Sequence, residues 1–268
     1  MTTYPEAPEG LLVDRDGPVL RIRLNRPERR NAMTDEMVLG LIEILDAASS
    51  DEGVRVISLS AEGANFCSGF DLGQRDTSER PRAGSIQRRM RWHVNRLIPA
   101  MLEVQLPIVS AATGSIVGLG LNLLLASDFA IVAEDARLWS PFTSSGFTPD
   151  SGGSWLLPRL VGVSRAKEMI LLGRQVTGSE AASWGVVYRA APSSEVKVLA
   201  DELVGELAGA ATVAVGLAKL LIHRSLTSDL NAHLADEALA LELASRSEDF
   251  KEGRRARGEK RPPDFGGR

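Results

Sequence analysis

Two short segments, residues 66–72 (FCSGFDL) and 118–122 (GLGLN), constrain the fold of this chain more than any other feature. In each, a strand-like apolar run breaks at a glycine and leads into a helical pattern. A break of this kind leaves backbone N–H groups without intrahelical partners at a helix start. Two such groups, if the fold brings them together, form a site for a carbonyl oxygen that gains negative charge. The alternative is that the glycines only permit tight turns or close packing.

Composition limits the fold and the location of the chain. Its 268 residues, 44% hydrophobic and 25% charged, are enough for one large α/β domain or for a core with a small appendage. The one cysteine, Cys67, rules out an internal disulfide framework and is typical of a reducing cytoplasm. Residues 1–17 lack a signal-peptide pattern, and no apolar run approaches the roughly 20 residues of a membrane helix. We therefore expect a soluble cytoplasmic protein outside the membrane.

The charge distribution leaves two interpretations open. A net charge of −4 argues mildly against a general nucleic-acid binder. Basic residues nevertheless gather at residues 26–30 and at residues 251–261. These groups are either a solvated turn and a solvated tail, or a local anion site for a phosphorylated ligand.

Hydrophobic patterns predict an α/β core followed by helices. Alternating residues at 11–13 and 19–24 predict a hairpin, and Thr34 is a good cap for the helix that follows. Further strands are expected at 54–59, 107–112 and 129–133, a loop at 74–85, and helices up to about 104 and at 118–126. Beyond Ser151 the expected helices are 163–172, 179–184, 196–207, 211–224 and 230–245. The C-terminal helices either cover the active site or pack against other subunits.

Several motifs in the chain resemble one family. Besides the two glycine-broken segments they are NRPERRNA at 25–32, ASD at 126–128, PDSGGS at 149–154, GSEAASWGVV at 178–187 and KRPPDF at 260–265. Their residues and order resemble the crotonase (enoyl-CoA hydratase/isomerase) superfamily. The resemblance implies a ClpP/crotonase-like spiral of ββα units over residues 1–195, with a CoA site and an oxyanion hole. It implies a helical trimerisation region over residues 196–268, in a homotrimer or in a hexamer built from two trimers.

The resemblance also implies the substrate and the site residues. The substrate is an acyl-CoA thioester of fatty acid metabolism, with coenzyme A as part of it, and no permanently bound cofactor, metal or nucleic acid is expected. The oxyanion hole falls on the backbone N–H groups of Phe70 and Leu119, where one donor is worth about 3–4 kcal/mol to an enolate. The implied substrate-binding residues are Arg26, Arg29, Ala64, Ser68, Gly69, Asp71, Leu72, Gly118, Asn122, Phe142 and Ser145.

The acid–base groups depart from those of the hydratases. The two glutamates of the hydratases fall on Asn122 and Phe142, and neither side chain transfers a proton at neutral pH. Asp150 falls on a position that supplies a catalytic aspartate in dienoyl-CoA isomerases, 4-chlorobenzoyl-CoA dehalogenases and ring-opening isomerases of phenylacetyl-CoA breakdown. Residues 146–159 look most like this last, 1,2-epoxyphenylacetyl-CoA isomerase branch. The alternative is that Asp150 only caps the helix that follows it.

We therefore expect an enoyl-CoA isomerase that uses Asp150 to move a proton through a thioester enolate. The sequence leaves open an enoyl-CoA hydratase (a lyase), an acyl-CoA hydrolase or a dehalogenase on the same fold. A non-catalytic binder of RNA or CoA is a third class. The acyl group is set by pocket walls for which the sequence carries no readable code.

Overall fold

The computed structural model describes residues 4–74, 82–92 and 94–268. Most of the loop expected at residues 74–85 lies outside them. Within the described residues the chain forms a six-stranded sheet in the order β1-β2-β3-β4-β6-β9 and a three-stranded sheet in the order β5-β7-β8. The strands are β1 (Leu11–Asp16), β2 (Val19–Leu24), β3 (Val56–Ala61), β4 (Ile108–Ala112), β5 (Ser115–Val117), β6 (Phe129–Ala133), β7 (Arg137–Trp139), β8 (Val176–Thr177) and β9 (Arg189–Ala191).

The expected hairpin is confirmed at the edge of the large sheet. β1 and β2 pair antiparallel through the turn at Gly17 and Pro18, whereas the other pairs of this sheet are parallel. Parallel strands need crossover connections, and these are supplied mainly by helices. β3 and β4 are buried along most of their length, as expected of strands covered on both faces.

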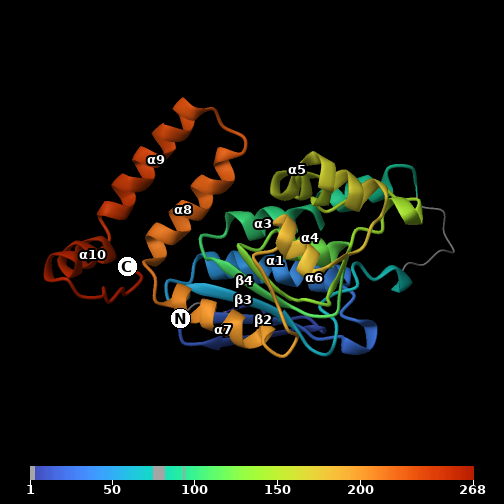
Figure 1. Ribbon diagram of the computed structural model, residues 1–268, viewed down its shortest axis with the longest axis horizontal. Coiled ribbons are helices and arrows are strands. Elements are labelled where there is room, and N and C mark those ends of the chain that lie inside the picture. Colours follow the sequence, from blue (N-terminus) through green and yellow to red (C-terminus); the bar gives the residue numbers. More distant parts are fainter. Residues whose placement is uncertain (1–3, 75–81, 93) are drawn as a thin grey trace.

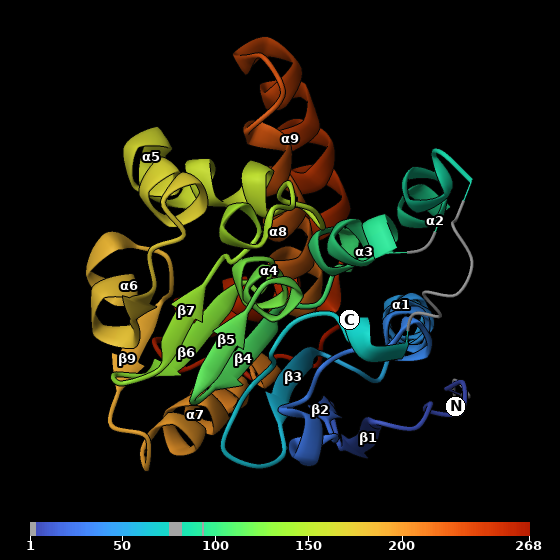
Figure 2. The same ribbon diagram turned by 90° about the vertical axis from the view of Figure 1, so that its right-hand side faces the viewer.

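Helices cover both faces of this sheet (Figures 1 and 2). α1 (Asp35–Ser49), α3 (Leu97–Glu103) and α4 (Leu119–Leu125) lie on one face, and α7 (Val196–Ala208) lies on the other. The expected cap of α1 is confirmed, because the Thr34 hydroxyl accepts a hydrogen bond from Met37 N at 3.2 Å. α1 buries apolar residues at helical spacing against the sheet, including Met37, Leu41 and Ile44.

The remaining helices include one that begins earlier than expected. They are α2 (Ser85–Trp92), α5 (Gly153–Leu171), α6 (Gly178–Trp184), α8 (Thr212–Ser225), α9 (Leu230–Ser245) and α10 (Glu248–Glu259), with short 3₁₀ turns at Pro27–Arg29, Leu72–Gln74, Val94–Arg96 and Thr143–Ser145. α5 begins ten residues before the expected start at 163. Gly152, Gly153 and Pro158 make its first part look unlike a helix, and Gly162 breaks it where the prediction began.

α8 and α9 form a hairpin that stands away from the sheet (Figure 1). Lys219 fixes its base: the buried Nζ donates to Met101 O at 2.8 Å and to Leu106 O at 3.0 Å, and lies 2.8 Å from Asp128 Oδ2. Burial lowers the pKa of Lys219, and Asp128 opposes that shift. The expected boundary at residue 196 falls at the start of α7, which packs on the sheet; the helices that stand clear begin with α8.

The basic segment 251–261 forms most of α10 and the turn after it, and several of its charges are paired locally. Glu252 accepts hydrogen bonds from Arg255 and from Arg261, and also from Asp264 N at 3.0 Å. Lys251 pairs with Glu248. The tail beyond α10 therefore folds back onto the helix through Glu252.

None of the described helices is by itself long and apolar enough to cross a membrane. α7 and α8 meet the length and composition of a span only together, and they are bent by 109° at the break between them.

Acid is predicted to weaken the attachment of the tail to α10. The pKa of Glu252 is lowered from 4.5 to about 2, chiefly because Arg261 donates to its carboxylate and because Asp264 N adds a further bond. A carboxyl group with a depressed folded-state pKa stabilises the fold above its unfolded pKa, and this contribution is lost as the pH falls from about 4.5 to about 2. Glu252→Gln should therefore lower Tm at neutral pH, by an amount that shrinks in acid.

Thermal melting between neutral pH and about pH 3 measures this effect. Glu248→Gln, which removes an exposed carboxylate from the same helix, is the matched control and should change Tm less. A Tm difference between Glu252→Gln and the parent chain that stays constant with pH would contradict the assignment.

Candidate functional site

Backbone hydrogen bonds hold the first glycine-broken segment against β5. Cys67 N donates to Ser115 O at 3.0 Å, and Val117 N donates to Cys67 O at 2.9 Å. Gly69 therefore lies beside the end of β5, where a Cβ placed on it would be 3.2 Å from Val117 O and 3.8 Å from Leu119 N. The two segments that the sequence analysis singled out thus meet at the start of α4.

The opposite edge of the first segment pairs with Met33. Met33 N donates to Gly69 O at 2.9 Å, and Asp71 N donates to Met33 O at 2.8 Å. In extended backbone, successive residues direct their N–H and C=O groups to opposite edges. Because Gly69 O and Asp71 N face Met33, the N–H of Phe70 is directed to the other edge, towards the end of β5.

Gly118 provides the sharp change of direction between β5 and α4. Its backbone angles are φ 56° and ψ −116°, a combination that residues with a side chain rarely adopt. Leu119 follows as the first residue of α4, so its N–H has no intrahelical acceptor. The backbone of Phe70 and the N–H of Leu119 thus both lie at the junction of β5 and α4.

A cavity of about 330 Å³ opens beside these two segments. Nine of the predicted site residues line it: Ser68, Gly69, Phe70, Leu72, Gly118, Leu119, Phe142, Ser145 and Asp150. The cavity is also lined by residues that the sequence did not predict as part of the site: Ile86, Val94, Val117, Pro141, Phe147, Thr148 and Ser151. Phe147 and Thr148 lie just before Asp150, so their proximity in sequence to the candidate acid was a usable signal.

Other predicted residues lie on two turns behind the cavity. Ser68 N donates to Arg30 O at 2.9 Å, which brings the turn at residues 26–31 beside the turn at residues 62–68. Asn31, fully buried and with φ 54°, joins them through hydrogen bonds from Nδ2 to Glu62 O and Asn65 O. Arg29 and Ala64 are exposed on these turns, and neither lines the cavity.

Arg26 and Asp71 pair with each other. Arg26 Nη1 donates to Asp71 Oδ2 at 3.0 Å and to Ala32 O at 2.7 Å, and both side chains are largely buried. Burial acts to raise the pKa of Asp71, but hydrogen bonds from Gly73 N and Arg26 outweigh it and hold that pKa below its usual range. Asp71 directly follows Phe70, so this ion pair holds the backbone of Phe70 in place.

Asp150 lies in a turn rather than on a regular helix end. Ser151 and Gly152, which follow it, have φ values of 48° and 86°. The N-cap of α5 is Gly152, a glycine two residues after Asp150. Asn122 Nδ2 donates to Asp150 O at 3.1 Å, and Asn122 lines neither of the cavities at this turn.

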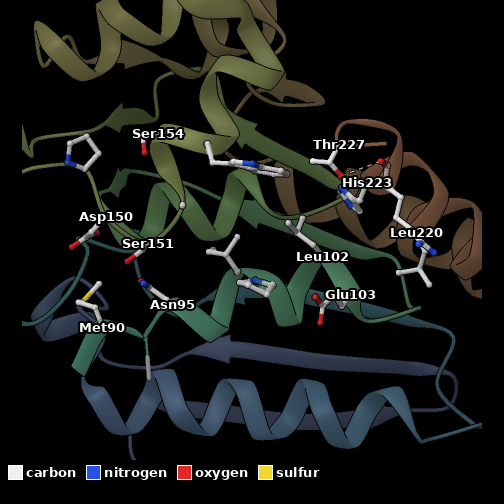
Figure 3. A pocket seen from close by; sticks show the side chains of 16 residues that line it. Met90, Asn95, Leu102, Glu103, Asp150, Ser151, Ser154, Leu220, His223 and Thr227 are labelled. Atoms are coloured by element: carbon white, nitrogen blue, oxygen red, sulfur yellow. Dashed lines mark hydrogen bonds between the residues drawn. The ribbon is translucent and has the colours of Figure 1, made fainter. Parts of the chain in front are cut away.

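A second cavity, of about 900 Å³, adjoins the first (Figure 3). The two share Met90, Asp150 and Ser151. The second cavity extends between α3, the start of α5 and α8, with Leu102 on its wall, and Figure 3 shows His223 at the end away from Asp150. Asp150 therefore stands at the boundary of two connected spaces.

A metal site and a cysteine nucleophile find no support among the described residues. No group of three or more His, Cys, Asp or Glu side chains is placed there to hold a metal ion. Cys67 is fully buried, and burial raises the pKa of its thiol to about 12. At neutral pH this thiol is protonated and is a poor nucleophile.

Gly118→Ala should destabilise the site region. A side chain at φ 56° and ψ −116° costs roughly 1–3 kcal/mol, and relief of that strain would rotate the N–H of Leu119. Chemical denaturation should show this loss. Gly205→Ala in α7, where a Cβ meets nothing within 4 Å, is the matched control and should be neutral or stabilising. Equal stabilities of the two variants would contradict the strain at residue 118.

Comparison with known proteins identifies the family. The family model described as enoyl-CoA hydratase/isomerase matches residues 14–268. The chain is 34% identical to the 1,2-epoxyphenylacetyl-CoA isomerase of Escherichia coli K12 (93% of this chain, 95% of that protein) and 32% identical to the 2,3-dehydroadipyl-CoA hydratase of the same strain (96% and 99%). A solved enoyl-CoA hydratase structure from Bacillus anthracis superposes with a TM-score of 0.90 at 31% identity (97% and 100%). The chain therefore belongs to the enoyl-CoA hydratase/isomerase family, has the crotonase fold, and is an enzyme of a family that acts on CoA thioesters.

Proposed function

We propose that this protein is an enoyl-CoA isomerase that shifts a carbon–carbon double bond along the acyl chain. One observation carries the proposal: among the described residues that line the smaller cavity, Asp150 is the one carboxylate. Asn122 and Phe142 occupy the positions where the resemblance places the glutamates of a hydratase. A single carboxylate is enough to take a proton from one carbon and return it to another.

The thioester oxygen would bind where Phe70 and Leu119 meet. Removal of a proton from the acyl chain moves negative charge onto this oxygen and forms an enolate. Two backbone donors fixed in advance stabilise that charge without reorganising, and one such donor is worth about 3–4 kcal/mol. The close packing of the Phe70 segment on β5 supports this role, because it fixes the donors before substrate arrives.

Asp150 would carry the proton between the two carbons. As a carboxylate it removes a proton from one position of the bound 3-enoyl or 2-enoyl thioester, and as a carboxylic acid it delivers that proton two carbons away. Its place at the boundary of the two cavities supports this role. The thioester would occupy the smaller cavity, and the distal part of the acyl chain would extend past Asp150 into the larger one.

Coenzyme A would lie over the two turns behind the smaller cavity. Arg29 is exposed beside Ser68, with its carbonyl oxygen accepting a hydrogen bond from the Ser68 hydroxyl at 3.3 Å. We assign phosphate contacts to Arg29, and contacts through the exposed backbone of this surface to Ala64 and Ser68. Arg26 would act indirectly, since its guanidinium pairs with Asp71. The proposal requires no further cofactor.

One observation favours hydration as the second candidate. Asp150 is exposed and borders the larger cavity. That cavity has room for water, and polar residues such as Ser154 and Thr227 lie on its wall. A carboxylate in this position can direct a water molecule to the β-carbon. A hydratase, hydrolase or dehalogenase reaction would then use the same oxyanion donors.

Asp150→Asn should abolish turnover and leave the fold intact. The amide keeps the size of the side chain but cannot exchange a proton, so the rate should fall by roughly 10²–10⁴-fold. The assay incubates the protein with 3-enoyl-CoA and 2-enoyl-CoA of several chain lengths and follows the products by mass. Isomerisation conserves mass, whereas hydration adds the mass of one water.

The matched control is Asp135→Asn, which neutralises an exposed carboxylate in the turn between β6 and β7. It should retain full activity. An isomerase rate in Asp150→Asn close to that of the parent enzyme would contradict the proposed role of Asp150. If the parent enzyme instead gives a product heavier by one water, the reaction is hydration and not isomerisation.

We also propose that α9 packs against other copies of the chain in a trimer or in a pair of trimers. None of its residues is buried in the single chain, and Leu239 and Leu243, one turn apart, are 65% and 58% exposed. Apolar residues at this spacing form one face of a helix, and exposed apolar patches mark association surfaces.

Light scattering measures the mass of the assembly. Leu239→Glu combined with Leu243→Glu should reduce it, because carboxylates would be buried without partners. Val198→Glu, at an exposed apolar site on α7, is the control and should leave the mass unchanged. A parent chain that is monomeric at all concentrations would overturn the proposed assembly.

A further inference from the structure

The first turn of α4 carries two groups that face different parts of the site. Leu119 begins the helix and supplies one of the proposed oxyanion donors. Asn122, three residues later, lies on the same turn, and its N–H donates to Gly118 O at 3.1 Å to close that turn. Asn122 is 1% exposed, so its side chain is enclosed by protein.

The side chain of Asn122 contacts the turn that carries Asp150. Its Nδ2 donates to Asp150 O at 3.1 Å. Its Oδ1 lies so close to the start of α5 that a Cβ on Gly153 would be only 2.6 Å from it. The amide of Asn122 therefore fills the space between α4 and the beginning of α5 and bonds to the backbone of Asp150.

The backbone of this turn is unusual. Ser151 and Gly152 both have positive φ, which is unfavourable for serine, and the N-cap of α5 is Gly152. Within the turn, Gly153 N donates to Asp150 O at 3.2 Å, but that bond does not connect the turn to the rest of the site. The bond from Asn122 does make that connection.

We infer that Asn122 is a positioning residue that sets the location of the Asp150 carboxylate relative to the N–H of Leu119. The N–H of Leu119 and the carboxylate of Asp150 are then both positioned by a single helical turn, from residue 119 to residue 122. Misplacement of a catalytic group by about 1 Å can cost roughly 100-fold in rate, so such a connection matters for proton transfer. The inference rests on the isomerisation proposed above.

Asn122→Leu tests the inference, because it keeps a side chain of similar size and removes the donor. The kcat for isomerisation should fall by about tenfold to a hundredfold, while KM should stay within about twofold. A second readout isolates the oxyanion donors: bound acetoacetyl-CoA ionises to an enolate that is followed by its ultraviolet absorbance. The enolisation pKa of the bound ligand should be the same in Asn122→Leu and in the parent enzyme, since Phe70 and Leu119 keep their places.

A purely structural role for Asn122 would give another pattern. Distortion of α4 would raise the enolisation pKa of bound acetoacetyl-CoA along with the loss of kcat. Ser127→Ala is the matched control at the far end of α4, where the Ser127 hydroxyl bonds to Ser110 Oγ at 2.6 Å and to Leu123 O at 3.0 Å. It removes partly buried hydrogen bonds just beyond the end of the same helix and should leave kcat unchanged.

The outcomes separate the inference from the proposed function. No isomerisation by the parent enzyme would overturn the function. An active parent enzyme with an unimpaired Asn122→Leu variant, or with enolate binding lost together with kcat, would overturn only the inference. If Asn122→Leu does not fold, Asn122→Ala takes its place: it removes the donor to Asp150 O without adding bulk, and should separate kcat from enolate binding in the same way.

Discussion

The arrangement of the site depends on the backbone pairing of residues 67–71 at both edges. Cys67 pairs with β5 on one edge, and the residues flanking Phe70 pair with Met33 on the other. This narrow segment links the turn before α1 to the strand that leads into α4. Because the bonds are between backbone atoms, their geometry tolerates changes of the side chains at Phe70 and Leu119. The pocket walls can therefore vary around a fixed backbone.

Where hydrophobic periodicity is strong, the sequence predicts the fold well. The hairpin of β1 and β2, the capped helix α1, and the bounds of β6 and α9 follow from alternation, helical spacing and cap residues. The strands β5, β7 and β8 have three residues or fewer, too short for a period, and were not predicted. α10 was treated only as a basic tail because its charges pair along the helix and beyond it, which composition does not reveal.

For the candidate site, the sequence located the segments better than it located the side-chain partners. Nine of the residues suggested by motif and resemblance line one cavity. Arg26 and Asn122 line neither of the cavities around Asp150, since their polar groups bond to Asp71 and to Asp150 O. These partners are 45 and 28 residues away in sequence, and no local pattern links them. The walls from α3 and α8 are likewise brought together only by the tertiary fold.

Lys219 anchors a helix, α8, that forms both part of a cavity wall and one arm of the hairpin with α9. Its buried ammonium ties the helix to α3 and to the segment that leads into β4. The adjacent Leu220 and, one turn later, His223 lie on the wall of the larger cavity. Beyond that wall, α8 continues into the hairpin with α9. The cavity wall and the hairpin thus share one continuous helix, which is anchored at residue 219. Because α8 belongs to both, a shift of this helix would move the cavity wall and the hairpin together.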